Sequence, residues 1–299
     1  MSSPTTHSKT VDEGTFIGAN GLTLFYRSQY PSSAHTGEEN MCKVKGVLAL
    51  VHGLGEHSGR YGTVFESLTE AGYAVFSFDN QGHGRSQGQR GHISSWQDYR
   101  DNLSAFLKLV RKQAPTAPLF VMGHSLGGLI VLDYILQTEQ SNFFDIQGVV
   151  ISAPPVQPCN DTVSRIRVLM ARFLSGLFPR FSVKIGLDQS GLSRQKQVAN
   201  DVANDPLNHP YVTLRWGSEI MKTIEWVRSH ISQLQTPILL VHGDADPIMN
   251  YQGSCTLFEE IESNDKTLKI YAGSYHEPHN DLDAAVEMRD IVDWLEQHL

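Results

Sequence analysis

The sequence predicts an α/β protein with a mostly parallel central sheet and helices on both of its faces. Short apolar runs of the kind that form buried strands alternate along the chain with stretches whose apolar residues have helical spacing. This alternation is typical of βαβ units. Strands are expected at residues 22–29, 46–51, 73–78, 119–122, 148–152, 238–241 and 268–271, and helices at 61–71, 95–113 and 126–136.

The length of 299 residues fits one core domain that carries an insertion. Residues 15–153 and 222–299 are expected to form this core, and the polar residues 1–14 a flexible tail. No strand of the central sheet is indicated between 154 and 221, and this stretch opens with prolines that stop a helix or a central strand, at Pro154, Pro155 and Pro158. We therefore expect residues 154–221 to form a helical cap inserted after the sixth strand.

Composition argues against several classes of function. The net charge of −8 disfavours nucleic acid as a partner, because proteins that bind it concentrate Lys and Arg. No apolar run approaches the roughly 20 residues that a membrane span needs, and the N-terminus lacks the apolar core of a secretory signal, so the cytoplasm is the expected location. Three cysteines without a CxxC pair and the absence of HExxH indicate neither a disulfide framework nor a metal site.

The cap contains a local reversal of charge. Residues 165–184 include five basic residues and no acidic one, namely Arg165, Arg167, Arg172, Arg180 and Lys184. On a helical wheel the apolar residues of this stretch share one face, with arginines at its edges, which is the pattern of an interfacial helix. Such a face can contact a membrane or a lipid droplet, and it can equally pack onto the core or line a tunnel.

A Gly-x-Ser-x-Gly sequence lies between an expected strand and an expected helix, at Gly123-His-Ser125-Leu-Gly127. By itself this pattern also occurs in glycine-rich turns. Its position between a strand and a helix is typical of the nucleophile elbow of α/β-hydrolases, where glycines allow the strand and the helix to approach closely. Ser125 is therefore the candidate nucleophile.

A serine nucleophile needs a base and an acid that orients this base. In α/β-hydrolases the acid follows a later strand, and two candidates, Asp244 and Asp246, come after the strand expected at 238–241. Asp244 suits a turn, whereas Pro247 holds the preceding residue in an extended conformation. We expect Asp246 to be the acid.

The base should follow the last strand, where His276 and His279 are both available. His276 lies nearer the strand end, so a short loop can bring its imidazole to the serine. The tetrahedral intermediate also needs two backbone N–H donors. These are expected from Leu126, directly after the nucleophile, and from Leu54 in the loop after the strand at 46–51.

Three further motifs make the chain resemble the monoacylglycerol lipases of the α/β-hydrolase superfamily. They are His-Gly-Leu-Gly-Glu-His-Ser-Gly-Arg-Tyr at 52–61, Asp-Asn-Gln-Gly-His-Gly-Arg-Ser at 79–86 and Leu-Ser-Arg at 192–194. The resemblance implies the same triad and oxyanion donors, an apolar acyl channel under the cap, and a polar pocket end organised by Glu56, Arg60 and His279. Glu56 and Arg60 could equally form a structural i,i+4 ion pair.

The resemblance implies hydrolysis of monoacylglycerols, or of similar single-chain lipid esters, without a cofactor. Two alternatives remain open: a lysophospholipase or general carboxylesterase with the same triad, and a noncatalytic lipid-binding protein. Members of the family often carry a tyrosine in the cap just before Asp-Pro-Leu. Here residues 199–204 contain no aromatic side chain.

Overall fold

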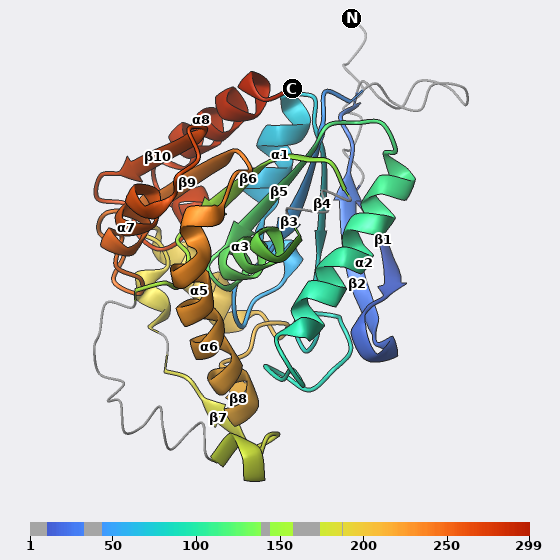
Figure 1. The fold of residues 1–299 in the computed structure, drawn as a ribbon, viewed down its shortest axis with the longest axis vertical. Coiled ribbons are helices and arrows are strands. Elements are labelled where there is room, and N and C mark those ends of the chain that lie inside the picture. The colour runs from blue at the N-terminus through green and yellow to red at the C-terminus, as the bar shows by residue number, and fades with distance from the viewer. Residues whose placement is uncertain (1–10, 33–43, 139–143, 158–173, 187) are drawn as a thin grey trace, which may run out of the picture.

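The computed structural model describes residues 11–32, 44–138, 144–157, 174–186 and 188–299. Within them, eight strands form one twisted sheet in the order β1-β2-β4-β3-β5-β6-β9-β10 (Figure 1). The strands are β1 (Asp12–Ile17), β2 (Thr23–Gln29), β3 (Val47–Val51), β4 (Ala74–Phe78), β5 (Leu119–His124), β6 (Ile146–Ser152), β9 (Ile238–Gly243) and β10 (Lys266–Tyr271). All neighbours from β4 to β10 are parallel, so the predicted mostly parallel α/β fold is confirmed.

Helices cover both faces of the sheet, and the alternation of side chains along β3 shows why. Val47, Ala49 and Val51 join one buried cluster, whereas Leu48 and Leu50 join a second cluster on the opposite face. The first cluster packs against α2 (Gln97–Gln113), α3 (Leu126–Thr138), α6 (Leu214–His230) and α7 (Gln252–Glu260), and the second against α1 (Gly62–Glu70) and α8 (Ala284–Gln297). Strands that are apolar on both sides therefore lie fully buried between two helical layers.

The N-terminal edge of the sheet differs from the prediction. The flexible tail expected over residues 1–14 is wrong for residues 12–14, because these begin β1, which pairs antiparallel with β2. β1 lies at the edge of the sheet and exposes alternate residues, so it lacks the continuous apolar run of a central strand. Phe16 anchors it by packing against the first cluster.

Between β6 and β9 the described chain leaves the central sheet. This part contains β7 (Ser182–Lys184), α5 (Lys196–Asn204), β8 (Tyr211–Thr213) and α6. β7 and β8 pair with each other and not with the central sheet, at the end of the molecule opposite the C-terminus (Figure 1). The expected boundary between residues 221 and 222 falls inside α6, which packs against α3.

The amphipathic helix expected over residues 165–184 lies largely outside the described residues. Within them, residues 174–177 are helical, but 182–184 form β7, so the expected helix is wrong for that end of the stretch. Phe181 and Val183 have exposed side chains there. Among the residues that the structure describes, no helix has the length and apolarity needed to cross a bilayer.

Candidate active site

Ser125 occupies a sharp turn between β5 and α3. Its φ of 51° lies in the left-handed region, which costs energy for a residue with a side chain. The turn is possible because its flanking residues are glycines: a Cβ on Gly123 would lie 2.3 Å from the Gly127 carbonyl oxygen, and one on Gly127 only 2.0 Å from that of Val51. The backbone N–H of Ser125 donates to the carbonyl of Ser152 on β6 at 2.8 Å, which fixes the turn to the sheet.

The loops after three parallel strands bring Ser125, His276 and Asp246 together. His276 Nε2 lies 3.1 Å from Ser125 Oγ, and His276 Nδ1 lies 2.6 Å from Asp246 Oδ2. The other carboxylate oxygen of Asp246 accepts the backbone N–H groups of Ile248 and Met249 at 2.7 and 3.0 Å. This is the arrangement in which an imidazole takes a proton from a serine while a carboxylate holds its tautomer.

The two aspartates after β9 have different surroundings. Asp246 is buried against His276, whereas Asp244 is exposed and accepts the backbone N–H of Gly273 at 2.6 Å. Asp244 therefore closes a turn between two loops. The structure places the carboxylate of Asp246, and not that of Asp244, on the imidazole.

The electrostatics of the pair suit general-base chemistry. Burial alone would lower the pKa of His276, but the adjacent carboxylate of Asp246 outweighs it and raises that pKa above the ordinary value of 6.5. Burial alone would raise the pKa of Asp246, but His276 and the hydrogen bonds to its oxygens hold that pKa well below its usual range. Asp246 is thus ionised at neutral pH, and His276 is a stronger base than a free imidazole.

His279 is buried beside this group. Its ring stacks on Tyr61 with centroids 4.9 Å apart and meets His124 edge-on at 4.9 Å. Burial is the main cause that lowers the pKa of His279 to about 4. Neither ring nitrogen has a hydrogen-bond partner among the described residues, so this neutral imidazole has unused polar capacity beside the triad.

The loop after β3 runs next to the nucleophile. A Cβ on Gly53 would lie 3.3 Å from the Cβ of Ser125, so no larger residue fits between the loop and the serine without a shift. The backbone N–H of Gly53 donates to Glu56 Oε1 at 2.6 Å, which holds the loop that carries Leu54. Leu126 begins α3 directly after Ser125, at the helix end where backbone N–H groups are free.

Glu56 and Arg60 form the i,i+4 ion pair that was one of the two predicted alternatives. Arg60 Nη1 lies 2.6 Å from Glu56 Oε2, and its guanidinium also binds both oxygens of Glu277 at 2.7 Å. Tyr61 donates its hydroxyl to Glu56 Oε1 at 2.7 Å. The cluster therefore ties the loop after β3 to the loop of His276.

The loop of His276 is also held by the segment that contains Leu192 and Arg194. The backbone N–H groups of His276 and Glu277 donate to the carbonyls of Gly191 and Leu192 at 3.3 and 2.8 Å. The Nε of Arg194 lies 3.0 Å from both carboxylate oxygens of Asp281, which itself accepts N–H groups from this loop. The Leu-Ser-Arg motif at 192–194 thus helps to hold the loop that carries His276.

Sequence reasoning missed two side chains at the site. Glu277 is the second carboxylate on Arg60, and His242 contacts Asp246 Oδ2 at 3.0 Å. Glu277 directly follows His276, but nothing in local sequence shows that its side chain reaches across to another loop. His242 could have been suspected from its polar character at the end of a buried strand.

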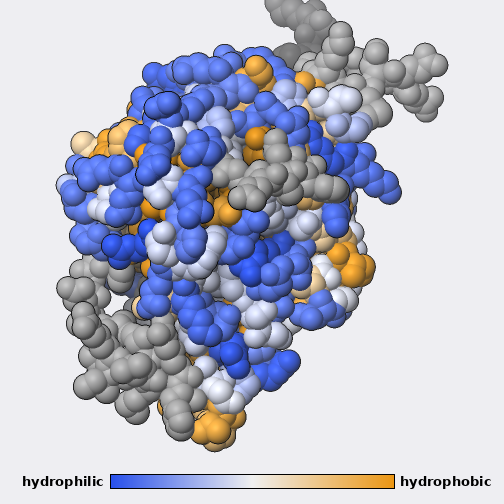
Figure 2. Space-filling model, viewed as in Figure 1, coloured by the Kyte–Doolittle hydropathy of each residue, from blue (hydrophilic) through white to orange (hydrophobic). Residues whose placement is uncertain are grey.

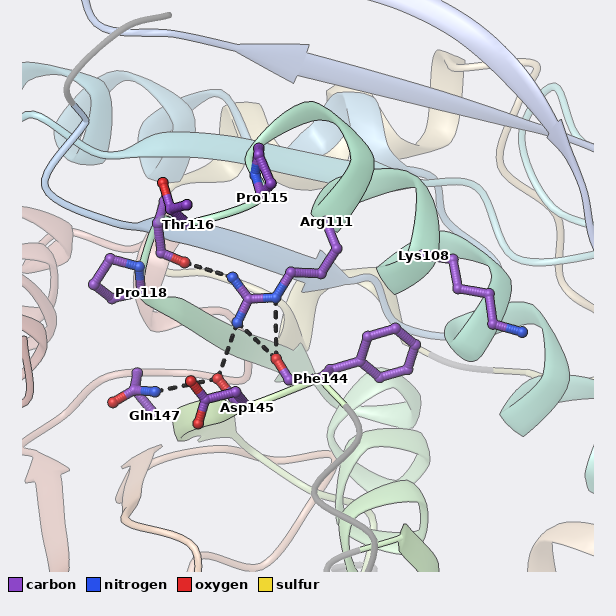
Figure 3. A pocket seen from close by; sticks show the side chains of 9 residues that line it. Lys108, Arg111, Pro115, Thr116, Pro118, Phe144, Asp145 and Gln147 are labelled. Carbon is purple, nitrogen blue, oxygen red and sulfur yellow. Dashed lines mark hydrogen bonds between the residues drawn. The ribbon is translucent and has the colours of Figure 1, made fainter.

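A surface pocket of about 570 Å³ lies away from this site (Figure 3). It is near the amino ends of β5 and β6, whereas the triad is at the carboxyl ends of the strands. Arg111 points into it, but its guanidinium donates to the backbone carbonyls of Ala117, Phe144 and Asp145. The guanidinium of Arg111 therefore links the loop before β5 to the loop before β6 through hydrogen bonds.

The fold and this arrangement of side chains define a serine hydrolase of the α/β-hydrolase class. A family model described as serine aminopeptidase, S33, matches residues 42–283. The monoacylglycerol lipase of Mycolicibacterium smegmatis is 30% identical over 293 residues, which cover 98% of this chain and 99% of the relative. The chain therefore belongs to the S33 family and, within it, to the monoacylglycerol lipases.

Solved structures agree with this assignment. The crystal structure of Paleococcus ferrophilus monoacylglycerol lipase, at 33% identity, gives a TM-score of 0.79 and covers 92% of this chain and 99% of that chain. A soluble variant of the monoglyceride lipase of Saccharomyces cerevisiae, crystallised with a substrate analog, is 26% identical. It gives a TM-score of 0.83 and covers 99% of this chain and 98% of that chain.

Proposed function

We propose that this carboxylic ester hydrolase cleaves monoacylglycerols to free fatty acid and glycerol, with Ser125 as nucleophile. The observation that carries the proposal is the continuous contact from Ser125 Oγ through His276 to Asp246, in a chain that matches monoacylglycerol lipases over nearly its full length. Such contacts are what activate a hydroxyl for attack on an ester carbonyl. No step of this chemistry requires a cofactor.

In the proposed reaction Ser125 Oγ attacks the ester carbonyl while His276 Nε2 accepts the hydroxyl proton. The tetrahedral intermediate collapses to an acyl-enzyme, and the protonated imidazole gives its proton to the departing glycerol oxygen. His276 then takes a proton from water as this water attacks the acyl-enzyme, and it gives the proton to Ser125 Oγ when the bond to the acyl group breaks and the fatty acid leaves. Asp246 stabilises the imidazolium in both halves, and the backbone N–H groups of Leu54 and Leu126 are proposed to bind the oxyanion.

We propose that the polar end of the pocket is organised by the cluster of Glu56 and Arg60 together with His279. Supporting this, the cluster shapes the loop beside Ser125, and no described residue forms a hydrogen bond with either ring nitrogen of His279. Hydroxyl groups are ligands that a neutral imidazole can either donate to or accept from. The apolar acyl channel is proposed to lie under the cap, residues 154–221.

The lead substrate is tested by a turnover panel. With monoacylglycerols, diacylglycerols, lysophospholipids and short-chain esters at equal concentration, we expect the highest kcat/KM for a monoacylglycerol. If the imidazole of His279 binds a glycerol hydroxyl, its removal should lower this preference. His279→Ala is expected to reduce the ratio of monoacylglycerol to short-ester kcat/KM by about tenfold, which corresponds to about 1.4 kcal/mol of transition-state stabilisation. A clear preference of the wild type for lysophospholipids would instead support the phospholipase alternative.

We further propose that the cap contacts a lipid surface, such as a membrane or a lipid droplet. Figure 2 shows an apolar area at the end of the molecule where β7 and β8 lie. Leu177, Phe178 and Phe181 there are about 60% exposed, with exposed Arg180 and Lys184 in the same stretch. Aromatic and aliphatic side chains beside basic ones suit the boundary of an anionic bilayer.

Vesicle binding tests this contact. The double variant Phe178→Ser/Phe181→Ser is expected to lose at least about tenfold in partition to vesicles that contain anionic lipid, because two inserted apolar side chains are removed. Turnover of a water-soluble short ester should stay unchanged. The exposed Leu282, which lies outside the cap, gives a matched control as Leu282→Ser. Equal partition of all three proteins would contradict a lipid-binding cap.

A further inference from the structure

His242 contacts the same carboxylate oxygen as the proposed catalytic base. It lies in β9, is fully buried, and its Nε2 is 3.0 Å from Asp246 Oδ2, while His276 Nδ1 is 2.6 Å from that oxygen. On its other side His242 Nδ1 lies 2.8 Å from Ser254 Oγ in α7. A line of contacts thus runs from α7 through two histidines and one aspartate to Ser125.

The direction of these hydrogen bonds follows from the charge of Asp246. Its pKa is held well below the usual range, so the carboxylate only accepts hydrogen bonds. Nε2 of His242 must therefore carry a proton, which it donates to Asp246, with the carbonyl of Met249 a second acceptor at 3.3 Å. Ser254 has no exposed surface, so no bulk water competes for Nδ1.

We propose that His242 is a positioning residue that orients Asp246 for His276, and that Ser254 fixes the imidazole of His242. The inference rests on the proposed function, because it assigns a role only if Asp246 serves His276. One oxygen of Asp246 is held by the two backbone N–H groups of Ile248 and Met249. His242 supplies the donor that holds the other oxygen at the imidazole.

The same contact tunes the basicity of His276. Each hydrogen bond that a carboxylate accepts disperses its charge, so removing the donor from His242 strengthens the interaction of Asp246 with the protonated imidazole. The pKa of His276 should then rise. A substitution of His242 leaves the other groups that face His276 and Asp246 unchanged. Around His276 these are Glu56, Glu277, His124, His279 and the hydroxyl of Ser125, and beside His242 it is Ser254.

Two amide variants of His242 separate positioning from packing. In His242→Gln the side-chain nitrogen reaches the place of Nε2 and still donates to Asp246, whereas in His242→Asn it reaches only the place of Nδ1, next to Ser254. Both side chains are uncharged amides, so we expect them to lower the stability of the fold by similar amounts. His242→Leu removes both contacts, and Ser254→Ala removes only the distal one.

The readout is the pH dependence of kcat/KM for a monoacylglycerol, with thermal unfolding as a check on folding. Activity requires neutral His276, so it should rise through the raised pKa of His276, above pH 6.5 in the wild type. We expect His242→Gln to keep the wild-type midpoint. His242→Asn and His242→Leu should move it upward by about 0.5–1 pH unit and lower kcat by about tenfold. Ser254→Ala should move it in the same direction by about 0.3 unit.

The inference is overturned if the midpoint stays at the wild-type value in the Asn, Leu and Ser254→Ala variants, whatever their kcat. It is also overturned if Gln and Asn behave alike, because a packing role would not distinguish them. Ser254→Ala decides the matter if the Leu variant does not fold. An active Ser125→Ala would instead show that the proposed function fails, independently of His242.

Discussion

Replacement of Ser125 by alanine is expected to lower kcat for monoacylglycerol hydrolysis by at least about 10⁵-fold, because no acyl-enzyme can form without the hydroxyl. The measurement is release of fatty acid under saturating substrate. Substrate should still bind, since only one small polar atom is removed. The structure predicts no loss of folding, because the hydrogen bond of Ser125 Oγ among the described residues is to His276, in the site itself.

The backbone at this position calls for a second variant. Ser125 has a φ of 51°, which glycine adopts at lower cost than alanine, so Ser125→Gly tests the loss of the hydroxyl with less strain. Ser190→Ala, at an exposed serine in the segment before Leu192, is the matched control and should retain full activity. If both Ser125 variants kept more than about one per cent of wild-type kcat, a serine nucleophile at this position would be excluded.

The second large effect is expected from Asp246→Asn, with a loss of about 10⁴-fold in kcat near neutral pH. The amide is almost isosteric, but its N–H can donate a hydrogen bond to His276 Nδ1. This favours the tautomer with the proton on Nε2, which cannot accept the proton of Ser125. It also leaves the imidazolium without an adjacent negative charge. The loss of kcat should persist at higher pH, because it comes from the tautomer of neutral His276 and not from protonation of the imidazole.

Asp244→Asn is the control for this experiment because it makes the same change two residues earlier. Asp244 is exposed and accepts one backbone N–H, from Gly273, which an amide oxygen also accepts. Its kcat should stay within about threefold of the wild type. Comparable losses in the two variants would contradict the assignment of the acid and would point to a general effect on the loop.

The inner strands of the central sheet were predictable because they are apolar on both faces. The run at 46–51 reads as a buried strand without any knowledge of its neighbours, and the structure has β3 at Val47–Val51. The chain order of serine, acid and base in this class allowed candidates to be named from local motifs alone. In each pair of alternatives, strand proximity or a following proline favoured the residue that the structure places in the line of contacts from Ser125 through His276 to Asp246.

Other features depend on contacts between distant segments, so local sequence does not encode them. β1 is recognisable only once β2 is available as its partner, since most of its residues are exposed and three of the exposed ones are polar. Glu277 acquires its role through Arg60, 217 residues earlier, and His242 through a carboxylate that also binds His276. A buried polar side chain at a strand end is a signal for such contacts, because an unpaired one would be costly.

The most direct test of the central claim is covalent labelling with a fluorophosphonate, followed by mass spectrometry of the digested protein. Such reagents are attacked by activated serine hydroxyls and remain attached as stable esters. We predict one adduct, on Ser125, which is absent in Ser125→Ala and forms much more slowly in Asp246→Asn. An adduct at another residue, or no adduct on a folded protein that hydrolyses monoacylglycerol, would contradict a mechanism based on Ser125.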